Sequence, residues 1–262
     1  MKKTALMGLV LSLSVSSLWS GTLGDEKTSY DWSGFYIGGS VGNIWSNFEG
    51  TLAAKSFIVD LLSFPASIQT FNASNNAIIS GGQVGYNWQM NKFIIGTELS
   101  LNGMNLSKSH TLTVKEAQST LLFSPGDSFQ SSIKWQAQWV TRLGIGIENW
   151  LFYAVGGVAF SEAKIRDTVI SANYFGFQAP TMSGSSSNLL FGGTVGAGTE
   201  YALTKHLHVG LEYRYSDYGS RNYFPSDVPA AYDTFGLLIY TQVISKMQLS
   251  TNKALAKIIY QF

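Results

Sequence analysis

The chain closes with Asn252-Lys-Ala-Leu-Ala-Lys-Ile-Ile-Tyr-Gln-Phe262, in which every second position from the last residue backwards is apolar. Successive side chains of a β-strand point to opposite sides, so Ile258, Tyr260 and Phe262 share one face with Ala256. A strand of about 9–11 residues with one apolar face is the unit from which transmembrane β-barrels are built. We take Ile258, Tyr260 and Phe262 as the signal of a closing barrel strand.

The opposite end of the chain predicts export. Lys2 and Lys3 are followed by an apolar segment at 5–13 and a small-residue region at 14–24. This order is that of a secretory signal peptide, and its apolar core is too short to span a bilayer as a helix. We expect a signal peptide at 1–20, with cleavage after residue 20 or 24, and a barrel domain at 25–262. Export combined with a barrel-type last strand predicts the bacterial outer membrane.

The composition excludes several classes of protein. Charged residues make up 13% of the chain and aromatic residues 14%, with 27 Gly and no Cys. The absence of cysteine excludes disulfides and Cys-based metal sites. A net charge of +1 provides no basic surplus for nucleic acid. No apolar run is long enough for a transmembrane helix.

Period-two patterns divide the chain into eight strands, which is the even number that a closed antiparallel barrel requires. The fourth is the clearest, because Trp135, Trp139 and Leu143 alternate with polar or small residues. The fifth is apolar on both faces, so its phase is open and a bulge is an alternative. We predict an all-β fold, an eight-stranded antiparallel transmembrane β-barrel, with strands at 35–45, 78–88, 93–104, 133–147, 151–162, 189–203, 207–216 and 252–262.

The connections alternate between short and long. Short links are expected at 89–92, 148–150 and 204–206, and long loops at 47–77, 106–132, 164–188 and 217–250. This alternation is typical of barrels with short periplasmic turns and long extracellular loops, and it places both termini in the periplasm. The apolar stretches 57–64 and 235–244 are interpreted as strands that continue beyond the bilayer or as loops that pack on one another. An extra pair of strands, making ten, is the alternative.

Charged residues recur on the face opposite the apolar one, which would line the barrel interior. Carboxylates and cations occur there in similar numbers, and burial requires them to pair. We predict a lumen charge network of Glu98, Lys134, Arg142, Glu200, Glu212, Arg214 and Lys257. The interior of an eight-stranded barrel is just wide enough for side chains to fill it, which disfavours a wide pore.

Aromatic residues near the predicted strand ends indicate girdles at the membrane boundary, Trp32 and Trp135 among them. His110, in the second long loop, is the candidate cofactor ligand, since a neutral imidazole can bind heme iron. A solvated loop histidine is the simpler interpretation. We expect no cofactor, with hemin as the alternative, and no metal site.

Seven segments carry a family resemblance. They are Asp31-Trp-Ser-Gly-Phe-Tyr-Ile-Gly-Gly-Ser-Val-Gly42, Gly81-Gly-Gln-Val-Gly-Tyr-Asn-Trp88, Ile94-Ile-Gly-Thr-Glu98, Arg142-Leu-Gly-Ile-Gly146, Tyr153-Ala-Val-Gly-Gly-Val-Ala159, Val195-Gly-Ala-Gly-Thr-Glu-Tyr-Ala202 and Leu211-Glu-Tyr-Arg-Tyr215. The chain resembles the OmpA-like β-barrel family, in particular small alphaproteobacterial surface proteins described as porin-like or hemin-binding. It departs from them in its long first and fourth loops and in the apolar Lys257-Ile-Ile259. The resemblance implies a fold and a location more than an activity.

We therefore expect a surface protein without enzymatic activity, which supports the outer membrane and contacts host or environment through its loops. A narrow porin-like channel or a hemin-binding receptor is the alternative. The expected partners are outer-membrane lipid and lipopolysaccharide, the barrel-assembly machinery and host surface molecules, with no nucleic acid.

Overall fold

Strands make up nearly all of the computed structural model, which describes residues 30–58, 62–63, 67–111, 126, 128–169, 173–174, 177–178, 182–223, 231–232 and 238–262. The predicted signal peptide and both cleavage positions lie outside these residues. The strands are β1 (Gly34–Ile58), β2 (Leu62–Ser63), β3 (Ser67–Met90), β4 (Phe93–Thr111), β5 (Ser128–Ile147), β6 (Trp150–Val169), β7 (Asn173–Tyr174), β8 (Phe177–Gln178), β9 (Met182–Ala202), β10 (Leu207–Tyr223), β11 (Ala231–Tyr232) and β12 (Leu238–Gln261). Among the described residues there is no helix of the length and apolarity needed to cross a bilayer.

Eight long antiparallel strands form a closed barrel, as predicted. Their order around the wall is β12-β10-β9-β6-β5-β4-β3-β1, and β1 pairs again with β12. This closing ladder runs from Tyr36 opposite Gln261 to Ile58 opposite Ile239. The two-residue strands β2 and β11 pair only with the far ends of β1 and β12. The ten-stranded alternative is therefore wrong for the wall itself.

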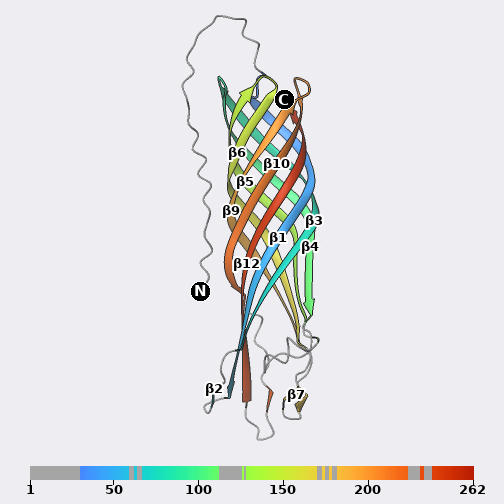
Figure 1. The fold of residues 1–262 in the computed structure, drawn as a ribbon, viewed down its shortest axis with the longest axis vertical. Helices are drawn as coiled ribbons and strands as arrows, with labels where there is room; N and C mark the ends of the chain where they lie inside the picture. Colours follow the sequence, from blue (N-terminus) through green and yellow to red (C-terminus); the bar gives the residue numbers. More distant parts are fainter. Residues whose placement is uncertain are drawn as a thin grey trace, which may run out of the picture.

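The alternation of short and long connections is confirmed. Asn91 and Glu148 lie in the short turns after β3 and β5 and have φ angles of 57° and 51°. Figure 1 shows these tight turns at one end of the tilted strands, together with the carboxyl terminus. We call this end the short-turn end and the opposite one the far end.

The strands extend well past the predicted spans. β1 and β12 are paired out to Ile58 and Ile239, so much of the predicted long-loop sequence is hydrogen-bonded ladder. These segments are polar and Gly-rich, which is the composition of loops. Strands beyond the bilayer share this composition, because they have no lipid to face and need no apolar side. Once the barrel closes, the register of the wall fixes which residues lie opposite one another, and the same strands continue to pair beyond the bilayer. The apolar stretch at 57–64 thus begins on a projecting strand, which is one of its two predicted interpretations.

The outer surface carries an apolar belt. On β6 the outward side chains run from Trp150 and Phe152 to Phe160, after which Glu162 is the first charged one. Ten residues at roughly 3.3 Å each, tilted by about 40°, rise about 25 Å, which is the height of a membrane-spanning barrel band. Neighbouring strands approach closely at Gly42, where a Cβ would overlap the carbonyl oxygen of Ala254.

A charge placed in this belt is expected to destabilise the fold. Leu211 points outward from β10 and is 64% exposed. Leu211→Arg should lower the free energy of unfolding by about 2–4 kcal/mol, because lipid offers the guanidinium no partner. Urea titration of the protein folded in lipid vesicles measures this. Asn149→Arg, in a short turn, should change it by less than about 0.5 kcal/mol. Equal losses in both variants would contradict the lipid-facing assignment.

Candidate functional site

The barrel interior holds a buried charge network at the middle of the wall. Glu98 on β4 is fully buried and contacts three cations. One carboxylate oxygen pairs with Arg214, and the other lies 3.4 Å from Lys257 Nζ and 3.7 Å from Arg142 Nη1. Tyr36 donates its hydroxyl proton to the same carboxylate at 3.0 Å. Glu98 is therefore the centre of the network.

Two further carboxylates complete it. Glu200 pairs with Arg142, and Glu212 pairs with Arg214 and, at 2.6 Å, with Lys257. The hydroxyl of Tyr153 donates to Glu212 at 2.8 Å, and the Arg142 guanidinium lies 4.0 Å from the centre of the Tyr153 ring. The structure thus brings together six of the seven residues predicted to line the lumen: Glu98, Arg142, Glu200, Glu212, Arg214 and Lys257.

Lys134 does not join them, and its predicted place in the lumen is wrong. The β5–β6 register shifts between Ile133 and Gln136, both of which face inward. The extra residue of this bulge leaves Lys134 and Trp135 on the outer side, where Lys134 is exposed. A strict period of two, as assumed from the sequence, cannot locate such a shift.

Sequence reasoning missed a seventh charge, Lys253 on β12, although alternation from Lys257 pointed to it. Lys253 is 1% exposed, and no carboxylate of the described residues forms an ion pair with it. Its Nζ donates at 2.5 Å to Gln138 Oε1, which also accepts from Arg214 Nη1 at 3.0 Å. Two cations thus share one neutral oxygen.

The two buried lysines of β12 should respond oppositely to the same substitution. Lys257→Met removes the partner of Glu98 and Glu212 and should lower the free energy of unfolding by about 3 kcal/mol. Lys253→Met removes a cation that lacks a carboxylate and should leave stability unchanged or raise it by about 1 kcal/mol. Urea midpoints in vesicles compare the two variants. A larger loss for Lys253→Met than for Lys257→Met would contradict this division of roles.

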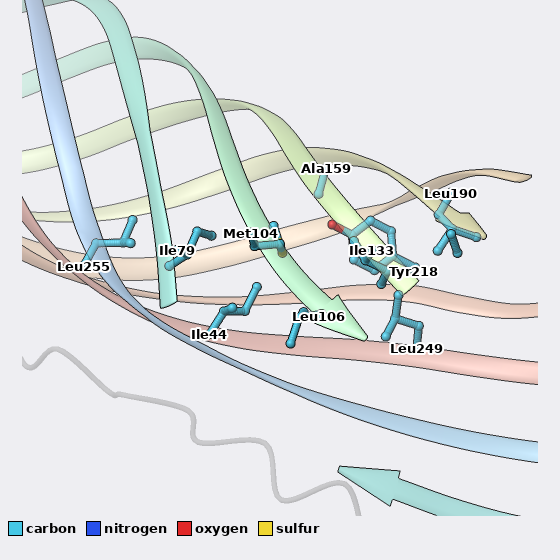
Figure 2. Close-up of a cluster of buried hydrophobic side chains, with 11 residues drawn as sticks. Ile44, Ile79, Met104, Leu106, Ile133, Ala159, Leu190, Tyr218, Leu249 and Leu255 are labelled. Atoms are coloured by element: carbon cyan, nitrogen blue, oxygen red, sulfur yellow. The ribbon is translucent and has the colours of Figure 1, made fainter. Parts of the chain in front are cut away.

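An apolar layer closes the interior toward the far end. Figure 2 shows its side chains converging from around the wall. Each of the eight long strands contributes at least one member, so the layer is built from the whole circumference of the wall. The members are Ile44, Ile79, Met104, Leu106, Ile133, Ala159, Ala163, Leu190, Tyr218, Leu249 and Leu255, all at most 9% exposed.

A second apolar layer closes the short-turn end, and its centre is Trp32. This tryptophan is 0% exposed and packs with Ile94, Leu151 and Ala202. Its expected role in an exposed girdle is wrong, because the chain before β1 turns into the barrel mouth. Gly146 makes room for it: a Cβ there would lie 3.1 Å from the indole.

The segment around Trp32 contacts two of the short turns, the end of β3 and the last strand. Tyr30 N–H donates to the Glu148 carbonyl at 3.2 Å, and Trp32 N–H donates to Gln89 Oε1 at 2.6 Å. The Tyr30 hydroxyl donates to the Lys205 carbonyl at 2.6 Å. On β12, Gln261 Nε2 donates to the carbonyl of Asp31 at 3.1 Å. We call residues 30–33 the clasp.

His208 completes the clasp from β10. Its Nε2 lies 2.7 Å from the Tyr30 oxygen, whose single proton is directed at Lys205. His208 must therefore donate from Nε2. Partial burial, with the charge of Asp31 nearby, raises the pKa of Tyr30 to about 12, so the phenol stays protonated at neutral pH.

The candidate ligand His110 lies near the far end of β4, where its backbone pairs with Phe129. The surroundings of its side chain lie outside the described part of the chain, so its role toward hemin stays a prediction. Within the described ranges, no three His, Cys, Asp or Glu side chains gather as a metal site would require.

Comparison with known families agrees with this architecture. The model of the outer membrane protein β-barrel domain matches residues 5–243. The chain belongs to this family. As a member of the outer membrane β-barrel family it resides in the bacterial outer membrane, with its short turns in the periplasm and its far end outside the cell.

Relatives of the chain are outer-membrane proteins. The 31 kDa outer-membrane immunogenic protein of Brucella melitensis is 24% identical over 232 residues, covering 85% of this chain and 89% of its own length. The 22 kDa outer membrane protein of Rhizobium leguminosarum is 27% identical over 201 residues, covering 75% and 69%.

Solved structures of outer-membrane barrels also align with the chain. OprG of Pseudomonas aeruginosa is 12% identical with a TM-score of 0.42, and the alignment covers 88% of this chain and 96% of OprG. The protease OmpT of Escherichia coli is 11% identical with a TM-score of 0.45, covering 90% and 99%. At these scores neither likeness bears on activity.

Proposed function

We propose that this outer membrane β-barrel is a non-conducting scaffold, which supports the membrane and displays its projecting strands and loops to host or environment. The observation that carries the proposal is the closure of the interior at three levels. The clasp and its apolar layer lie at the periplasmic mouth, the charge network at the middle, and the layer around Leu106 toward the outside.

The two apolar layers argue against the porin-like alternative. An ion moving along the axis would lose much of its hydration at each layer, where the packed side chains are mostly apolar and leave few polar partners, and this loss is costly. The network between the layers is held by buried ion pairs in which each carboxylate contacts a cation. Opening a path would require breaking these pairs, at several kcal/mol each.

The projecting strands argue for display. The closed wall satisfies the backbone hydrogen bonds within the lipid, so the residues beyond it can vary without endangering the fold. Relatives from Brucella are named immunogenic proteins of the outer membrane, which in this chain would correspond to an exposed outer end. None of the relatives' names denotes an enzyme, and the proposed role involves no catalysis.

Electrical recording on purified protein in planar lipid bilayers tests the scaffold proposal. We expect no discrete conductance steps from wild-type protein, while a general-diffusion porin inserted by the same procedure gives steps. Reproducible steps from the folded wild-type barrel would overturn the proposal and support the narrow channel. Heat-dependent gel mobility of the same sample establishes that the barrel is folded.

A further inference from the structure

Three exposed cations gather on the outer face of β5 and β6, at the extracellular end. They are Lys134, Lys164 and Arg166, and all three side chains are exposed. In the β5–β6 ladder, Lys164 lies opposite Ser132 and Arg166 opposite Gln130. Neighbouring strands are about 4.8 Å apart and alternate residues about 7 Å apart, so the long side chains reach a common area.

The bulge in β5 places Lys134 in this group. The residues at 134 and 135 together oppose Glu162, so Lys134 lies beside Trp135 on the outer side instead of in the lumen. Bulges are local departures that re-aim side chains. Here the departure moves a positive charge from the barrel axis to the boundary of the apolar belt.

The carboxylate of Glu162, which lies among these cations, is already occupied. Glu162 accepts from Trp135 Nε1 at 3.3 Å and from the Ser187 hydroxyl, and it lies 3.6 Å from Lys164 Nζ. Within the described residues, no carboxylate forms an ion pair with Lys134 or Arg166. The group therefore keeps a net positive charge and two cations available to an anion.

The level of the group relative to the membrane identifies the anion. The apolar belt ends beside it, with Phe160 on β6 and Leu189, 66% exposed, on β9. Lys164 and Arg166 lie roughly 10 and 15 Å beyond Phe160 along the barrel axis. Hydrocarbon chains contact the belt below, so the anions concentrated nearest to this level are the headgroups that those chains carry.

We propose that Lys134, Lys164 and Arg166 form a binding site for the phosphate-bearing headgroup of an outer-leaflet lipid. Lysine and arginine near a membrane surface attract anionic headgroups, and arginine can bind phosphate through two parallel hydrogen bonds. Hydroxyls in the same rows supply further donors, Ser132 on β5 and Ser107 opposite it on β4. The lipid site and the scaffold role both assume that the far end lies outside the cell, but they share no other premise. Either proposal can therefore be disproved without the other.

The experiment compares lipid retention in nanodiscs of phosphatidylcholine with a minor fraction of lipid A. Three proteins are extracted mildly. They are the wild type, a triple variant that combines Lys134→Gln, Lys164→Gln and Arg166→Gln, and a control variant that combines Lys92→Gln and Lys205→Gln. Retained lipid A is counted by native mass spectrometry. The control removes two exposed cations from the periplasmic turns. We expect binding to weaken roughly fivefold for each cation removed from the outer group and to be unchanged in the control.

Three outcomes would overturn the proposal. Equal retention of lipid A by the triple variant and the wild type would show that these three cations do not form a lipid site. An equal loss of lipid A retention in the control variant would show that retention depends on the overall charge of the protein and not on this group of cations. Displacement of lipid A by low concentrations of inorganic phosphate would assign the cations to free phosphate instead of a lipid. The single variant Arg166→Gln, with a smaller expected loss, replaces the triple variant if heat-dependent gel mobility shows that the latter is unfolded.

Discussion

Glu98→Gln is expected to lower the free energy of unfolding by about 3–5 kcal/mol, because it leaves buried cations without their common partner. Glu98 is the carboxylate that joins Arg214, Lys257 and Arg142, and all four side chains are at most 4% exposed. Glutamine keeps the shape but not the charge, so the remaining cations repel one another in a medium where water cannot screen them. Urea titration of the barrel in lipid vesicles, followed by tryptophan fluorescence, measures the loss.

Glu49→Gln provides the matched control. Glu49 is exposed on β1 and undergoes the same chemical change outside the network. We expect its effect to remain within about 0.5 kcal/mol. If the urea midpoints of the two variants coincide, the buried ion pairs contribute to stability only through the space that their side chains fill. The charges of the interior would then not stabilise the barrel.

Trp32→Ala is expected to cost about 3–5 kcal/mol, the loss typical of removing a large buried aromatic side chain. The indole lies 4.8 Å from the Tyr30 ring and 4.7 Å from the His208 ring, centre to centre. Its removal leaves a cavity where the clasp joins the periplasmic turns. The same vesicle titration measures the change, and wild-type Trp32 should contribute a strongly blue-shifted component to the emission.

Trp32→Phe should restore a large part of this loss, because a phenyl ring fills much of the same space. Lys92→Ala, in the adjacent exposed turn, should have little effect. An alanine variant as stable as wild type would show that the clasp does not anchor the periplasmic end.

Local chemistry was sufficient to predict the wall of the barrel. Side chains at alternate positions, such as Ile258, Tyr260 and Phe262, must face lipid, and polar ones such as Glu98 and Arg142 must then face inward. The short turns followed from the same pattern, since the predicted outward face ends at Trp88 and resumes at Phe93; the structure continues the ladder to Met90 opposite Phe93. These features depend on neighbours in the chain, which a single sequence contains.

Features that depend on strands far apart in sequence could not be predicted. Trp32 looked like a girdle residue because nothing near it shows that Gly146 leaves space for it inside the mouth. The projecting ladders beyond 45 and 252 have no periodic pattern, because their pairing is inherited from the closed wall below.

The sequence by itself determined that the chain is an eight-stranded barrel with lipid outside and charge inside, because period two and the solvent on each face are local properties. Only the tertiary structure decided which charges meet, which layers close the axis, and that Lys134 lies outside. Those outcomes depend on a bulge and on the registers between strands that are distant in sequence. These are fixed only when the barrel closes and the inward side chains pack together in one interior.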